Sequence, residues 1–151
     1  MRVVIQRVRY ARLSVDGVLV SQIGHGLMVL VGISEQDAQP EIDYLCRKIT
    51  ALRIFDDADG VMNRSVMDID GDVMAVSQFT LMASTKKGNR PSYICAARPE
   101  ISAPLYQGFC MTLERCLGKP IAQGVFGADM QIEMLNDGPV TITIDTEIDK
   151  K

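Results

Sequence analysis

The chain has 151 residues and a formal net charge of −3 at pH 7, with 47% apolar and 23% charged residues. This composition is typical of a soluble globular protein, and the length suits one domain, residues 1–151, with its own core. The acidic balance argues against a protein that coats nucleic acid non-specifically, and the longest apolar run, 26–33, is far shorter than the roughly 20 residues that cross a bilayer.

The first third of the chain indicates β-strands. Residues 2–8 form one strand-like run, and residues 11–24 form two more that turn at Asp16-Gly17. Asp-Gly between alternating apolar residues is a strong hairpin signal. The run 27–33 is apolar without alternation, which predicts a strand covered on both faces.

A helix is predicted from Pro40 to about residue 51, because proline suits a first turn and apolar residues then recur at helical spacing. Those residues are Ile42, Leu45, Cys46, Ile49 and Leu52. A short strand near 52–55 and a turn at 57–60 follow, whereas residues 61–70 have no clear state. Residues 71–81 indicate a buried strand that ends in polar residues.

A second helix is predicted from about Pro99 or Ser102 to Leu117, where Gly118 and Pro120 stop it. The chain closes with strand-like runs around 129–135 and 139–145, and the Asn-Asp-Gly between them favours a hairpin turn. Strands outnumber helices. The pattern therefore predicts an α+β fold, a curved, barrel-like and largely antiparallel sheet with a few helices packed on the outside.

Cysteine and histidine usage limits the chemistry. None of the four cysteines forms a CxxC pair, so they are interpreted as buried small hydrophobes of a protein in a reducing, cytoplasmic environment. They are Cys46, Cys95, Cys110 and Cys116. Because His25 is the single histidine, sites built on several histidines are excluded. No ligand cluster indicates a metal and no motif indicates a cofactor, so none is expected.

Polar side chains gather where the strand within 71–81 ends. Ser77, Gln78 and Thr80 follow an apolar run, and such strand ends are common binding sites. A nucleophilic hydroxyl needs a base in reach, but His25 lies between two glycines and Lys86 lies in a basic loop. A hydrolase driven by a side-chain nucleophile is therefore poorly supported, and a strand that simply leaves the core remains an alternative.

Gly138-Pro139 interrupts the second predicted hairpin. Base rates favour a trans bond, since only about 5–6% of X–Pro bonds in folded proteins are cis. Either the proline only stiffens the turn, or the backbone geometry is itself useful, because main-chain carbonyl oxygens are acceptors that cannot rotate away from a ligand.

Two motifs, SQFTL at 77–81 and NDGPVT at 136–141, together resemble the D-aminoacyl-tRNA deacylase family. The likeness extends through IQRV, IGHGLMVLVG, RIFDDADGVMN, GNRPS, LYQGF and GADMQI, and so covers almost the whole chain. It implies a cytoplasmic homodimer that hydrolyses the ester between a D-amino acid and the 3′ end of tRNA, and also glycine mischarged on tRNA for alanine. No membrane association is implied.

The resemblance also implies roles for individual residues. Ser77, Gln78, Phe79 and Thr80 would line the catalytic site. Gly138 and Pro139 would form a filter, with the bond between them cis, whose carbonyl oxygens exclude an L side chain in the partner subunit's pocket. Arg7, Met130 and Asn136 would lie near this filter or hold it.

Three hypotheses follow. The first is a deacylase in which a ribose hydroxyl of the substrate assists and backbone N–H groups hold the oxyanion; it is preferred to Thr80 as nucleophile. The second is a dimeric RNA-binding module without hydrolysis. The third is a conventional serine or threonine esterase acting on small esters.

Overall fold

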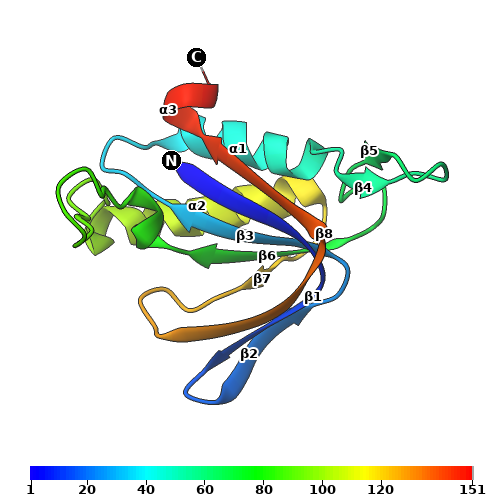
Figure 1. The fold of residues 1–151 in the computed structure, drawn as a ribbon, viewed down its shortest axis with the longest axis horizontal. Helices are drawn as coiled ribbons and strands as arrows, with labels where there is room; N and C mark the ends of the chain where they lie inside the picture. The colour runs from blue at the N-terminus through cyan, green and yellow to red at the C-terminus, as the bar shows by residue number, and fades with distance from the viewer. Residues whose placement is uncertain (151) are drawn as a thin grey trace.

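The computed structural model describes residues 1–150, and the α+β prediction is confirmed (Figure 1). The strands are β1 Arg2–Val15, β2 Val18–Ile23, β3 Gly26–Gly32, β4 Phe55–Asp56, β5 Met62–Arg64, β6 Asp72–Ser77, β7 Ala122–Gln123 and β8 Met130–Asp145. The helices are α1 Gln39–Ala51, the 3₁₀-helix η1 Phe79–Met82, α2 Pro99–Leu117 and the short α3 Thr146–Asp149.

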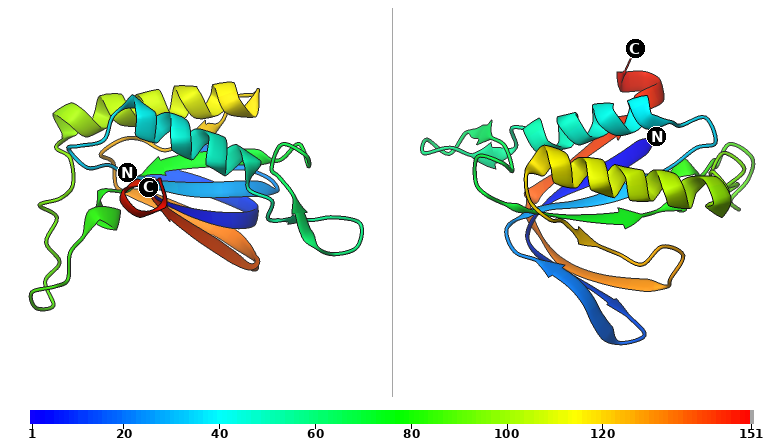
Figure 2. Two further views of the ribbon diagram at one scale, coloured as in Figure 1. Left: turned by 90° about the horizontal axis from the view of Figure 1, so that it is seen from above. Right: turned by 180° about the vertical axis from the view of Figure 1, so that it is seen from behind.

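Strand β1 organises the main sheet. One of its edges pairs antiparallel with β3 through residues 2–8 and with β2 through residues 11–15, while the other edge pairs with β8 along the whole strand. The outer halves of β1 and β8 therefore curl away with β2 and give the barrel-like curvature (Figures 1 and 2). Strands β3, β6 and β7 add two parallel pairings to an otherwise antiparallel sheet.

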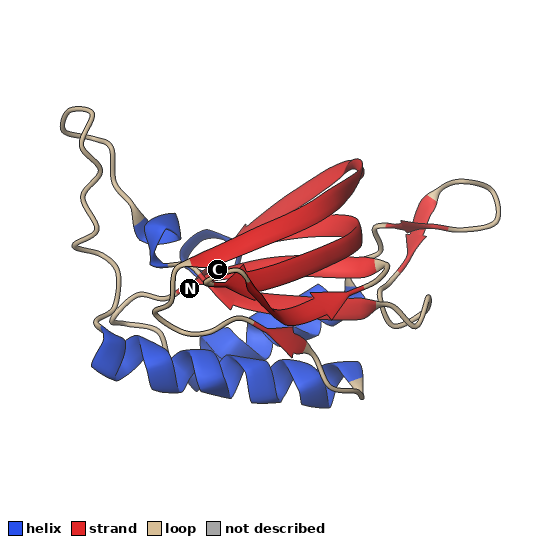
Figure 3. Ribbon diagram, turned by 90° about the horizontal axis from the view of Figure 1, so that it is seen from below, coloured by secondary structure: helices blue, strands red, loops and turns tan. Residues whose placement is uncertain are grey.

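The curled sheet has a core on each face. Helices α1 and α2 lie side by side over one face, as the view from above shows (Figure 2), and bury Phe109 and Leu113 against Ile5 and Leu27. On the other face, the curl of the sheet brings strands together around a second core that includes Leu13 and Met74. The coloured view from below shows both helices on a single side of the strands (Figure 3). None of the helices within residues 1–150 has the length and apolar character needed to cross a membrane.

The predicted second hairpin is wrong. Residues 130–145 form one strand, β8, which runs past Asn136–Thr141 without reversing. Between the pairs Gln6–Thr141 and Tyr10–Leu135, β1 has three residues and β8 has five, so the motif is a bulge. The reason is long-range: β1 is one long strand and offers β8 a continuous partner. Proline fits there because a bulge leaves a residue out of the hydrogen-bond ladder.

Of the remaining elements, α1, α2 and β3 match the prediction, whereas the runs 2–8 and 11–15 form the single strand β1, and β7, η1 and α3 were not predicted. Helix α2 spans Pro99–Leu117 and ends at Gly118, whose φ of 81° is left-handed. Residues 61–70, which had no predicted state, hold β5 and turns. The strand predicted over 71–81 is shorter, because β6 stops at Ser77 and η1 begins at Phe79. Cys46 and Cys110 are buried as predicted, but Cys95 is exposed and Cys116 is only partly buried.

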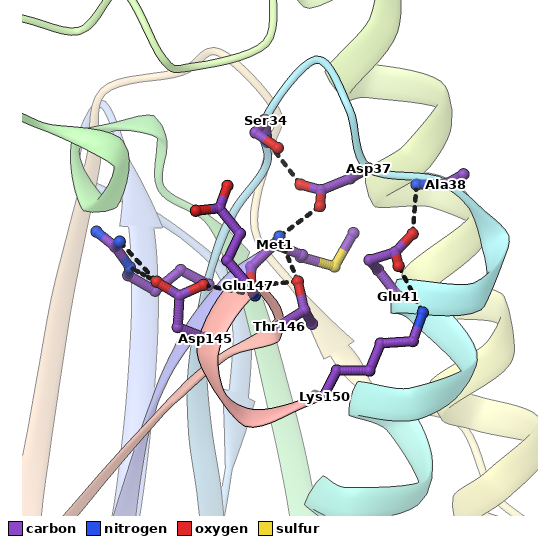
Figure 4. A network of polar contacts seen from close by, with 10 residues as sticks. Met1, Ser34, Asp37, Ala38, Glu41, Asp145, Thr146, Glu147 and Lys150 are labelled. Atoms are coloured by element: carbon purple, nitrogen blue, oxygen red, sulfur yellow. Dashed lines mark hydrogen bonds and ion pairs between the residues drawn. The ribbon is translucent and has the colours of Figure 1, made fainter.

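The two ends of the described chain meet beside α1 (Figure 4). The amino group of Met1 donates to Asp37 and, at 2.8 Å, to the hydroxyl of Thr146. Asp37 also accepts from the amide of Ser34 at 2.6 Å. This network fixes the start of β1, the end of β8 and the segment before α1 against one another, which secures the end of the sheet that carries Ser77.

Candidate active site

A cavity of about 570 Å³ opens where β6 ends. Its walls come from the ends of β3 and β6, from the segment between η1 and α2, and from the segment that leads into β8. The lining includes Ser77, Gln78, Phe79, Tyr93, Ala97, Ser102, Phe126, Asp129 and Met130. A rigid strand end beside long connections places polar groups at the rim of an apolar hollow, as is usual for small-molecule sites.

The change from strand to 3₁₀-helix brings consecutive residues to this cavity. The amide of Gln78 still donates to Val31 at 2.8 Å, and the chain then turns into η1. In a continuous strand, neighbouring side chains would point to opposite faces. Because the strand stops, Ser77, Gln78 and Phe79 all line the cavity.

Thr80 is placed differently. It is not among the residues that line the cavity, and its hydroxyl accepts a hydrogen bond from the Gln78 side-chain amide at 2.5 Å. This contact fixes the orientation of the Gln78 side chain. Thr80 therefore positions Gln78 and does not itself face the cavity.

Backbone donors are available at the mouth of the cavity. Phe79 and Thr80 open η1, and within residues 1–150 neither main-chain N–H has a hydrogen-bond acceptor. The first amides of a helical turn have no partner inside the turn. Such fixed donors can stabilise a negatively charged oxygen of a tetrahedral intermediate.

Among the described residues, no histidine or lysine lines this cavity, and the one carboxylate that does belongs to Asp129. His25 lies beside Asp137 instead, and Lys86 is exposed in the loop after η1. Behind the cavity, the hydroxyl of Tyr106 donates to the carbonyl of Ala75 at 2.9 Å, and burial raises its pKa well above the ordinary value. Tyr106 is therefore a neutral structural group. Residues 1–150 also contain no cluster of three His, Cys, Asp or Glu placed to hold a metal ion.

The Gly138–Pro139 bond is cis, and both residues are exposed. Arg7, which is only 7% exposed, holds the chain beside them. Its Nε donates to the main-chain oxygen of Asp137 at 3.1 Å, and its Nη1 donates to that of Ile54 at 2.6 Å. Gly138 itself has a φ of 123°, and an added Cβ would lie 3.0 Å from Arg7 Nη2.

Charged side chains surround this bulge and form a second cavity of about 300 Å³. Asp137 lies 3.2 Å from Arg9 and 3.7 Å from His25. His25, which had no role from the sequence, packs its ring edge-on against Phe55 at 5.2 Å. The bulge is thus supported from β1, from the β2–β3 turn and from β4.

The two groups of sequence-predicted residues lie apart within one chain. Arg7 pairs with Leu27 of β3, whereas Ser77 pairs with Val31, four residues farther along the same strand. At about 3.3 Å per residue, the separation along the sheet is roughly 13 Å. In Figure 1 the arrowhead of β6 points away from the region where β1 and β8 bend. Met130 lines the cavity, while the exposed Asn136 lies in the bulge.

Sequence reasoning missed several lining residues, among them Tyr93, Ala97, Phe126 and Asp129. They come from loops whose path depends on the fold. Tyr93 had one usable signal, an aromatic residue between polar and apolar loop residues; it meets Phe79 edge-on with ring centroids 5.1 Å apart.

Comparisons with known proteins agree on one family. The family model described as D-Tyr-tRNA(Tyr) deacylase matches residues 4–145. A D-aminoacyl-tRNA deacylase of Porphyromonas gingivalis is 62% identical over 146 residues, covering 97% of each chain. One of Bacteroides thetaiotaomicron is 60% identical over 147 residues, covering 97% of this chain and 98% of the relative.

Two solved structures share the fold. A c-Myc DNA unwinding element binding protein superposes with a TM-score of 0.92 at 41% identity, covering 96% of this chain and 98% of the other. A probable eukaryotic D-amino acid tRNA deacylase superposes with a TM-score of 0.80 over 95% of this chain and 97% of the other. At 19% identity, the second likeness concerns the fold alone.

Proposed function

Because the chain belongs to the D-aminoacyl-tRNA deacylase family and is a hydrolase of aminoacyl-tRNA esters, we propose that it removes D-amino acids from tRNA by an RNA-assisted reaction with a backbone chiral filter. The observation that carries the mechanism is the cavity at Ser77–Phe79, where free amides meet polar side chains and no histidine or lysine within residues 1–150 lines the wall. The enzyme acts in the cytoplasm as a homodimer.

The protein's share of catalysis is to position and stabilise. The ester enters the cavity with its carbonyl oxygen toward the amides of Phe79 and Thr80, and Ser77 and Gln78 hold the terminal adenosine and the ester. The ribose hydroxyl beside the ester orients or activates the attacking water. Holding reactants in place can contribute several kcal/mol to lowering a barrier (about 7–11 in favourable cases), so a protein base is not required.

The chiral filter acts across two subunits. Within one chain, Gly138 and Pro139 lie roughly 13 Å along the sheet from the level of Ser77. They are exposed and supported from behind by Arg7, so they are suited to enter a second subunit's cavity. Their carbonyl oxygens would occupy the space of an L side chain there. Met130 lines the receiving cavity, and Asn136 lies in the bulge that enters it.

This arrangement also defines a second substrate. Glycine has no side chain for the filter to reject, so glycine mischarged on tRNA for alanine would be hydrolysed as well. L-Aminoacyl-tRNA would be spared because its side chain meets the fixed oxygens of Gly138 and Pro139.

Two other functions make different predictions. A non-catalytic dimeric RNA-binding module would bind tRNA and leave the ester intact. A conventional esterase would cleave small esters without RNA and would lose its activity with Ser77→Ala or Thr80→Ala. The esterase is disfavoured because, in the part of the chain that the structure describes, no histidine or lysine lines the cavity to activate Ser77, and Thr80 does not line it at all.

The test is a paired assay with D- and L-tyrosyl-tRNA at equal concentration. We expect rapid ester loss from the D form and none above background from the L form. Equal rates on both forms would contradict the filter, and stable D-tyrosyl-tRNA would contradict the proposed enzyme. Sedimentation of the same preparation measures whether the active species is a dimer.

A further inference from the structure

Charge is unevenly distributed along the chain. Between Asp72 and Glu100 there is no acidic residue, and this segment carries four basic ones, Lys86, Lys87, Arg90 and Arg98. All 19 acidic residues lie in the rest of the chain, which therefore has a net charge of −7 against +4 for the segment. A protein of net charge −3 thus keeps one strongly basic region.

Three of these cations lie on a protruding loop, here called the basic finger, residues 84–92. Its base is a two-residue bridge, in which Ser84 and Ser92 exchange main-chain hydrogen bonds of 2.8 and 2.9 Å. Residues 85–92 are all exposed. The finger projects from the body of the molecule after η1, as two views show (Figures 2 and 3).

The charges on the finger are free to meet a ligand. Lys86, Lys87 and Arg90 form no ion pair with any residue of the described part of the chain. Arg98, by contrast, is paired with Glu35 at 3.3 Å. Three unpaired cations on one short exposed loop would repel one another, and a polyanion placed beside them relieves that repulsion.

The finger is anchored to the rim of the active-site cavity. Tyr93 follows its last residue, lines the cavity and packs against Phe79. Both aromatic rings are partly exposed, Phe79 by 57% and Tyr93 by 41%. Exposed aromatic side chains beside a basic stretch are the usual composition of a surface that binds single-stranded nucleic acid.

We propose that the basic finger binds the phosphate backbone at the acceptor end of the tRNA whose 3′-terminal ester occupies the cavity. This inference rests on the proposed function, since it takes the cavity as the ester site. The tip lies up to roughly 13 Å beyond the Ser84–Ser92 bridge, at about 3.3 Å per residue. Nucleotides that leave the cavity past Phe79 and Tyr93 would bring their phosphates to the cations of the finger.

The test neutralises the finger with Lys86→Gln, Lys87→Gln and Arg90→Gln together. A matched control neutralises three exposed cations on the helices, Arg47, Lys48 and Arg115, also to Gln, so that net charge changes equally. Both variants are compared with the unaltered enzyme for KM and kcat on D-aminoacyl-tRNA across a range of salt concentrations. Filter binding of uncharged tRNA provides a readout that does not depend on hydrolysis.

We expect the finger variant to raise KM by about 10-fold or more, to leave kcat within about two-fold, and to weaken binding of uncharged tRNA. The slope of log(kcat/KM) against log salt should become shallower by about 2, since each phosphate that a side chain neutralises adds roughly 0.7–0.9 to that slope. The control should behave like the unaltered enzyme. Equal effects of both variants, or no effect of the finger variant on KM and binding, would overturn the proposal. Failure of the proposed function would instead appear as no ester loss with the unaltered enzyme.

Discussion

Arg7 and Asp137 join the two longest strands at the bulge. Arg7 Nε on β1 donates to the main-chain oxygen of Asp137 on β8 at 3.1 Å, and the same guanidinium donates through Nη1 to Ile54 at 2.6 Å. One buried, planar group therefore satisfies two carbonyls that belong to separate parts of the chain. A lysine has the charge but not the fork that reaches both.

Arg7→Lys should therefore destabilise the protein. We expect the free energy of unfolding to fall by about 1.5–3 kcal/mol, the usual contribution of buried hydrogen bonds to a charged group. Denaturant unfolding measures it. The matched control is Arg9→Lys: Arg9 is 60% exposed in its ion pair with Asp137, so at most about 1 kcal/mol should be lost. Equal losses for both variants would show that the fork of Arg7 does not matter.

Gly138→Ala should impair activity more than folding. The φ of 123° is unfavourable for alanine, and the added Cβ would lie 2.9 Å from Val140 Cγ2 and 3.0 Å from Arg7 Nη2. We expect a destabilisation of about 1–3 kcal/mol and at least a ~10-fold slower hydrolysis of D-aminoacyl-tRNA. Single-turnover rates on D and L substrates measure it.

Gly60→Ala is the control for that change. Gly60 also has a positive φ, 75°, but nothing lies within 4 Å of its added Cβ. It should cost about 1–2 kcal/mol of stability and leave the rate unchanged. A Gly138→Ala enzyme with full rate that still spares the L substrate would remove Gly138 from the filter.

Acid should weaken the end of the sheet that carries the cavity. Burial alone raises the pKa of Asp145, but hydrogen bonds from the Arg2 guanidinium and the Glu147 amide outweigh it, so the pKa lies below its ordinary value. A carboxylate with a lowered folded-state pKa stabilises the fold above its unfolded pKa, near 3.9. That contribution is lost as pH falls through the folded value.

Asp145→Asn should consequently lower the free energy of unfolding at pH 7 by about 1 kcal/mol, a modest value because Arg2 is 37% exposed. The difference from the unaltered protein should shrink as pH falls below about 3.9, the unfolded-state pKa, and should vanish only below the lower folded-state pKa. Asp16→Asn is the control, since Asp16 is exposed in a turn that asparagine also suits. A difference that persists unchanged at low pH would show that the charge of Asp145 is not its cause.

The sequence predicted local features well and long-range ones poorly. Helical spacing and Pro99 with Gly118 placed α2 correctly, because these signals act within one element. The residues Asn136–Thr141 led to the wrong prediction of a hairpin. Their turn preference is a local signal, whereas β8 continues through them because it pairs with β1 along its length. The motif around Ser77 indicated the cavity, but Tyr93 and Phe126 reach it on loops whose path no local pattern specifies.

Hydrolysis should depend on the ribose hydroxyl of the substrate and not on the side chain of Thr80. Thr80 accepts a hydrogen bond from Gln78 at 2.5 Å and does not line the cavity, so Thr80→Ala should keep the rate within a few-fold of the unaltered enzyme. Removal of the 2′-hydroxyl from the terminal adenosine of the substrate tRNA should slow hydrolysis by about 100-fold or more, because no histidine or lysine of the described chain lines the cavity to replace it. Single-turnover assays of both changes, alone and combined, measure this. If instead Thr80→Ala abolished turnover while the 2′-deoxy substrate reacted normally, Thr80 would be the nucleophile and the RNA-assisted mechanism would be wrong.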